Sequence, residues 1–90
     1  MQEHPNPKGL RTEDLRLETD VILHRGNGSE QKMMIIGFPS FGNNRTILMG
    51  IYRENNPNRV WPEVFSLWNL GCEPDESGRW AVDYLTLAES

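Results

Sequence analysis

A chain of 90 residues has room for one domain with a single core. Its content of 37% hydrophobic and 24% charged residues is typical of a folded globular chain. A net charge of −4 argues against a general nucleic-acid binder, and no run of 18 apolar residues could span a membrane. The N-terminus lacks the apolar centre of a signal peptide, and the single cysteine, Cys72, cannot form an internal disulfide. We therefore expect a reducing, cytoplasmic setting.

The first third of the chain predicts a polar leader followed by a strand. Residues 1–11 contain two prolines and a glycine and are expected to be a flexible leader, so that residues 12–90 form one β-rich domain. Residues 12–14 could form a single helical turn. Polar and apolar residues then alternate from Leu15 to Arg25, which predicts a half-buried strand. The turn-forming residues 26–29 predict a hairpin.

Two segments in the middle of the chain are apolar at consecutive positions. Residues 32–38 and 46–53 both lack polar and apolar alternation, which is typical of central strands covered on both faces. Gly50 lies inside the second segment. A glycine there indicates a bulge, a bend or a close approach of another backbone.

The segment from Val60 to Leu70 fits two structures. Trp61, Val64, Phe65 and Trp68 have helical spacing, while Pro62 suits the start of a helix and Gly71 its end, so we expect a short helix over 62–70. The alternative is a further strand, since Val, Phe and Trp favour strands. Alternation from residue 80 to residue 87 predicts the last strand.

Together these elements predict a mainly β fold of four to five strands. We expect a small antiparallel barrel or curled sheet, SH3-like or partly open, with a three-stranded meander crossed by one helix as the alternative. Trp68 and Trp80 are expected to close one side of the core. The other residues expected to be buried are Val21, Leu23, Ile35, Leu48, Ile51, Val82 and Leu85.

The residues able to perform chemistry are few and scattered. His24 has no carboxylate or cysteine at a useful local spacing, so no nucleophile and base can be paired. Cys72 precedes Glu73, and such an acidic neighbourhood raises a thiol pKa, so we expect it to be unreactive and dispensable. The acidic turn 73–76 lacks the residue spacing of a calcium loop. We predict no catalytic residue, no metal and no cofactor, and hence no enzyme.

Residues 32–61 form a basic region in an acidic chain, with four positive side chains and one negative. Phe41 lies in a polar loop, outside any periodic pattern, and aromatic residues and arginine are enriched at interface centres. The loops 39–45 and 54–61 flank one strand, and a bend at Gly50 would bring them to one side. The predicted partner-binding residues are Phe41, Arg45, Arg53, Arg59 and Trp61.

These features favour a small non-catalytic interaction module that binds a protein partner as an accessory or inhibitory factor. The first alternative is a single-stranded nucleic-acid-binding barrel that uses the basic region and its aromatic residues, although the net charge disfavours it. The second is a homo-oligomeric structural protein, in which strands that are apolar on both faces pack across a symmetric interface.

Overall fold

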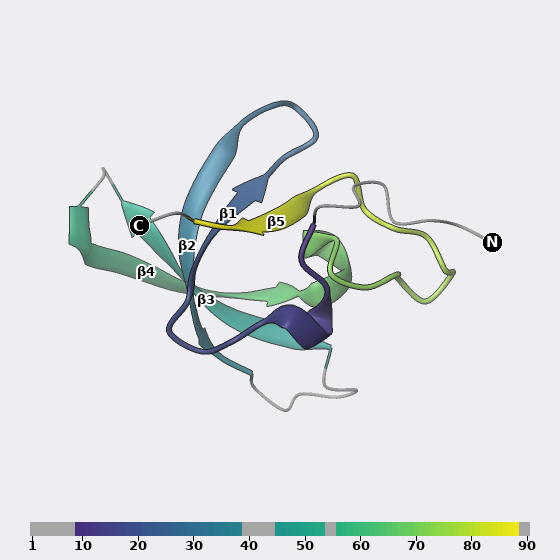
Figure 1. Ribbon diagram of the computed structural model, residues 1–90, viewed down its shortest axis with the longest axis horizontal. Coiled ribbons are helices and arrows are strands. Elements are labelled where there is room, and N and C mark those ends of the chain that lie inside the picture. The colour runs from purple at the N-terminus through teal and green to yellow at the C-terminus, as the bar shows by residue number, and fades with distance from the viewer. Residues whose placement is uncertain (1–8, 39–44, 54–55, 89–90) are drawn as a thin grey trace.

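Five antiparallel strands form one open sheet in the order β4-β3-β2-β1-β5 in the computed structural model, which describes residues 9–38, 45–53 and 56–88 (Figure 1). The strands are β1 (Asp20–His24), β2 (Glu30–Gly37), β3 (Thr46–Arg53), β4 (Asn56–Ser66) and β5 (Tyr84–Leu87). The mainly β prediction is confirmed. A barrel or a strongly curled sheet is wrong, because β4 and β5 stay at opposite edges and closure would require them to pair.

The predicted helix over 62–70 is wrong for most of its length. Every residue from Thr46 to Tyr52 is paired with a residue between Val60 and Ser66, so this part of β4 is extended. Only η2 (Leu67–Leu70) is helical, as a single 3-10 turn, and Gly71 ends it in a left-handed conformation. The described residues contain a second 3-10 turn, η1 (Thr12–Asp14), and no α-helix. Pairing with β3 therefore overrides the helical spacing.

The first strand is shorter than its alternating pattern predicts. Glu18 has a φ of 60°, a left-handed conformation that breaks an extended chain, and the strand begins only at Asp20. Leu17, which the pattern places in the core, is exposed as a result. The predicted hairpin turn over residues 26–29 is confirmed, since β1 pairs with β2 on either side of it.

The core lies on one face of the sheet, called here the inner face. Val21, Leu23, Ile35 and Leu85 are buried there as expected. Irregular segments cover it from outside the sheet, and the core continues into Leu15, η2 and Cys72. The remaining buried apolar residues are Met33, Ile47, Met49, Leu67 and Leu70. A single layer of irregular chain thus takes the place that a helix fills in many β-rich domains.

Of the residues predicted to be mostly buried, Val82 is exposed and Leu48 and Ile51 are less covered than the core. Leu48 lies on the other face of the sheet, called here the outer face, and is half-buried. Ile51 is half-buried against the core, and Val82 is 69% exposed in the segment before β5. Trp68 and Trp80 are also half-buried, with the guanidinium groups of Arg45 and Arg11 over their rings at 4.7 Å and 4.9 Å. The central strands have a cover on one face only, so apolar residues that alternate away from it stay partly exposed.

Gly71 joins the cover to the rest of the fold through a close backbone approach. Its φ is 73°, and a Cβ atom at this position would lie 2.0 Å from the backbone oxygen of Asp83. The turn is held by hydrogen bonds from the N–H of Gly71 to Trp68 and from the N–H of Cys72 to Leu67. Only glycine fits both the conformation and the space.

We expect Gly71→Ala to lower the free energy of unfolding by more than about 3 kcal/mol, because it adds a backbone collision to left-handed strain. Gly78→Ala is the matched control. Gly78 also has a positive φ, 86°, but a Cβ atom at this position would have no neighbouring atom within 4 Å. The free energy of unfolding of that control should fall by only about 1–2 kcal/mol. Urea unfolding of the two variants measures the difference, and equal losses would contradict the close approach at Asp83.

Candidate interaction surface

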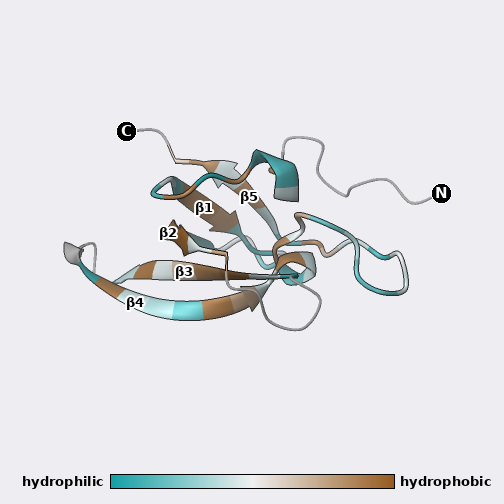
Figure 2. Cartoon of the chain, turned by 90° about the horizontal axis from the view of Figure 1, so that it is seen from below, coloured by the Kyte–Doolittle hydropathy of each residue, from teal (hydrophilic) through white to brown (hydrophobic). Residues whose placement is uncertain are grey.

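The β3–β4 hairpin extends beyond the segments that cover the inner face. Figures 1 and 2 both show its far end projecting away from η1 and η2. In Figure 2, apolar and hydrophilic segments alternate along β4, the edge strand of the sheet. Apolar side chains on both faces of the hairpin therefore meet solvent: on the inner face because the cover ends before the hairpin does, and on the outer face because it has no cover.

Trp61 is the largest of these exposed side chains, with 56% of its surface accessible. It pairs with Ile51 in the β3–β4 register and therefore lies on the inner face, past the end of the core. The guanidinium of Arg53 lies 5.1 Å from the centre of its indole ring, a cation–π distance. Arg59 precedes Trp61 by two residues in the same strand and is exposed. The structure thus brings together Arg53 and Trp61 of the predicted partner-binding residues.

The outer face of the sheet carries a second apolar group, made of Val60 and Val64 from this hairpin and Ile36 from the neighbouring strand β2. Ile36 is 40% exposed, Val60 39% and Val64 48%. Ile36 and Val60 come together over Gly50, since a Cβ atom on that glycine would lie 2.9 Å from Ile36 Cδ1 and 3.4 Å from Val60 Cβ. The atoms that approach Gly50 thus belong to side chains and not, as the sequence had predicted, to another backbone, and β3 pairs with β4 on both sides of it.

We call the exposed group on both faces of the hairpin the hairpin surface. It consists of Ile36, Arg53, Arg59, Val60, Trp61 and Val64. The three aliphatic members were not among the predicted partner-binding residues. Ile36 lies in a segment whose consecutive apolar residues predict a cover on both faces, and Val60 and Val64 lie in or beside the segment expected to be a helix.

Arg45 lies at the opposite end of β3 from Arg53 and is engaged within the chain. Its guanidinium forms an ion pair with Glu73, donates a hydrogen bond to the backbone oxygen of Pro74 and lies over Trp68. Glu73 also accepts a hydrogen bond of 2.8 Å from the hydroxyl of Thr12. Arg45 therefore helps to tie the cover to the sheet, and the structure does not bring it together with Trp61.

Phe41 lies outside the described residues, as do residues 39–44 of its loop and residues 54–55 of the other predicted loop. Its part in binding stays a prediction. The proposed meeting of the two loops depended on a bend at Gly50. The continuous β3–β4 pairing instead places Arg45 and Arg53 at the two ends of one strand.

Two titratable side chains elsewhere, those of His24 and Tyr52, are held in local contacts. His24 lies between Glu30 and the hydroxyl of Thr86, at 3.3 Å and 2.7 Å, and stacks on the ring of Tyr84. The Tyr52 hydroxyl donates to Asp20, and this hydrogen bond raises the pKa of the phenol. The described part of the chain contains no group of three His, Cys, Asp or Glu side chains able to hold a metal ion. It also contains no helix with the length and apolar character that crossing a membrane requires.

The acidic turn is likewise held by hydrogen bonds between its own residues. Asp75 accepts hydrogen bonds from the backbone and hydroxyl of Ser77 and from the backbone of Arg79. These bonds, first of all that from the Ser77 hydroxyl, lower the pKa of the Asp75 carboxyl. One oxygen of that carboxylate thus receives three donors and closes the turn.

Cys72 is buried in the core. Burial raises the pKa of its thiol to about 12, and the charges of Glu73 and Asp14 act in the same direction. At pH 8 only about one thiol in 10⁴ would be ionised at that pKa. Since the thiolate is the reactive form, the position and the pKa both oppose reaction in the folded protein.

We therefore expect Cys72 to react with Ellman's reagent at pH 8 very slowly in the native protein and completely within minutes in guanidinium chloride. The rate in native buffer should follow transient opening of the core, so a destabilising variant such as Gly71→Ala should raise it. Release of the coloured thiolate, followed by absorbance, measures both rates. Fast stoichiometric labelling of a protein that is still folded by circular dichroism would contradict the buried position.

Comparisons with protein-family models, with curated proteins and with solved structures find no match to this chain. No activity, ligand or partner is therefore transferred to it from a relative.

Proposed function

We propose that this protein is a non-catalytic interaction module, and that its hairpin surface binds a protein partner. The observation that carries the proposal is the exposure of Trp61 beside Arg53, beyond the limit of the covered core. A large exposed aromatic side chain costs solvation free energy unless a partner covers it. Trp and Arg are also the two residue types that most often dominate binding energy at interfaces.

The charges of the hairpin surface favour a partner with an acidic and apolar segment. Arg53 and Arg59 are its charged members, and Glu63 is the one described acidic residue of β4. The stacking of Arg53 on Trp61 holds the guanidinium beside an apolar plane, where a carboxylate of the partner would accept its remaining N–H groups. We propose that the partner's apolar side chains pack on Trp61 while its carboxylates meet Arg53 and Arg59.

Two features of β4 favour contact through side chains rather than addition of a strand. Pro62 lies in the middle of the part of β4 that pairs with β3, and Pro57 lies near its start. Proline on an edge strand removes a backbone donor and hinders pairing with another chain. An accessory or inhibitory factor that works by docking on its partner needs no more than such a surface. We propose a reducing, cytoplasmic setting for this protein.

We expect Trp61→Ala to weaken partner capture at least about 30-fold, which is the effect of losing an interface residue worth about 2 kcal/mol. Arg53→Glu should weaken capture as well, and more strongly at low salt than at high salt, because exposed charges are screened within about 10 Å at 0.1 M. Both residues are exposed, so both variants should keep their melting temperatures within a few degrees. The measurement is capture by the immobilised protein from nuclease-treated lysate, followed by affinity with the purified partner.

Leu17→Ala and Arg79→Glu are the matched controls, because both residues are exposed and lie outside the hairpin surface. Neither should change capture. Loss of every captured species on nuclease treatment would overturn the proposal in favour of single-stranded nucleic acid, which Arg53 and Trp61 could also stack against. Recovery of copies of this chain alone, with a dimer mass in solution, would overturn it in favour of a homo-oligomer.

A further inference from the structure

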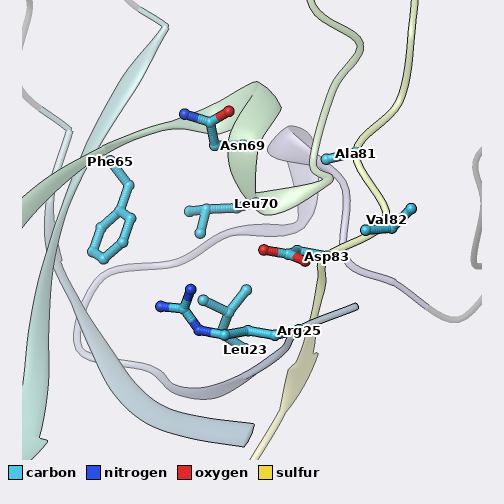
Figure 3. Close-up of a pocket in the computed structure, with 8 residues that line it drawn as sticks. All are labelled: Leu23, Arg25, Phe65, Asn69, Leu70, Ala81, Val82 and Asp83. Carbon is cyan, nitrogen blue, oxygen red and sulfur yellow. The ribbon is translucent and has the colours of Figure 1, made fainter. Parts of the chain in front are cut away.

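A groove of about 380 Å³ lies away from the hairpin surface, where the end of β1 meets η2 and the segment before β5 (Figure 3). Leu23 and Leu70 are its buried apolar lining, and Phe65 is half-buried beside them. Val82, which is highly exposed, lies at the same groove. This volume falls within the range of small-ligand sites in proteins, and apolar walls of this kind fit one apolar side chain.

Arg25 brings a positive charge into this apolar space. Figure 3 shows its guanidinium reaching into the groove on the side of Phe65 and Leu70. Within the described residues the Arg25 side chain makes no ion pair or hydrogen bond, and its backbone N–H is bonded to Ser29. Its N–H donors are therefore open to a ligand, and a guanidinium binds carboxylates through two parallel hydrogen bonds.

Two further polar side chains line the groove, Asp83 and Asn69. One carboxylate oxygen of Asp83 accepts a hydrogen bond of 3.0 Å from the backbone N–H of Gly26, which fixes the side chain. The second oxygen is an acceptor for an N–H group. Asp83 would repel a plain carboxylic acid, so the groove favours a ligand that has an N–H donor next to its carboxylate.

We propose that this groove binds the C-terminal residue of a peptide chain that ends in an apolar side chain. The terminal carboxylate binds Arg25, the amide N–H of the last residue donates to Asp83, and the apolar side chain packs on Leu23, Phe65 and Leu70. Arg25 and Val82 at this groove are exposed, so it reaches the protein surface, where the preceding residues of the peptide would leave it. This inference does not depend on the proposed function, because no residue that lines the groove belongs to the hairpin surface.

The experiment uses the full chain and a short peptide, acetyl-Gly-Ser-Gly-Phe, with either a free or an amidated C-terminus. Titrations followed by amide NMR should give saturable shifts at Asn69, Leu70 and Val82 with the free acid. Amidation should weaken binding at least about tenfold, as loss of one charge-assisted contact predicts. Arg25→Gln should weaken binding of the free-acid peptide to the same degree, and amidation of the peptide should then cause no further loss of affinity. Arg79→Gln is the control and should leave both affinities unchanged.

Arg25→Lys keeps the charge and serves as a second variant, which should retain part of the preference for the free acid. Binding of free phenylalanine as tight as that of the peptide would overturn the assignment to a peptide end, as would equal binding of the acid and the amide. Absence of saturable shifts in the folded protein would overturn the site altogether. Because Trp61→Ala leaves the groove intact, it should leave peptide affinity unchanged, which separates this result from the test of the hairpin surface.

Discussion

The extent of the cover over the inner face is the constraint on which the rest of this structure depends. Ninety residues give five strands but no helix within the described part to pack across them. The sheet is covered instead by the segment around Leu15 and by the turn that runs from η2 to Cys72. The contact of Glu73 with Thr12 joins the two parts of that cover, and the contact of Glu73 with Arg45 and the close approach of Gly71 to Asp83 tie the cover to the segments that lead into β3 and β5. Because this cover is short, it packs against only part of the inner face, and the end of the β3–β4 hairpin extends beyond the core.

Much of the strand content follows from sequence pattern. The central strands β2 and β3 and the hairpin between β1 and β2 are where the apolar runs and turn residues place them. The failure at β4 has a specific cause. Its apolar residues, Val60, Trp61, Val64 and Phe65, fall on both faces of the strand, and such a set matches helical spacing equally well. Pairing with β3 decides between the two, and pairing partners lie outside any local window.

The candidate site is predicted less well from the sequence, because the local pattern does not show which arginines are bound within the chain and which are exposed. Arg45 and Arg53 stand at the two ends of β3, and both belong to the basic region. Arg45 meets Glu73, which is 28 residues later in the chain, whereas Arg53 meets Trp61 across the hairpin. The first contact holds the fold together and the second leaves a charge at the surface. These two arginines are distinguished only by the register of β3 with β4 and by the path of the cover, and no local sequence motif predicts either.

The proposal of binding is supported by which of the described side chains are held in internal contacts and which are open. A catalytic acid, base or nucleophile must be free to exchange a proton or an electron pair with a substrate. In this fold the carboxylate of Asp75 closes its own turn, the imidazole of His24 is held between two partners, and the thiol of Cys72 is buried. Among the described residues, the guanidinium groups of Arg25 and Arg53 remain open beside apolar surface. A guanidinium stays protonated at any physiological pH, so it can hold a carboxylate and does not act as a base. Recognition of a carboxylate is therefore the chemistry that both of the proposed binding places have in common.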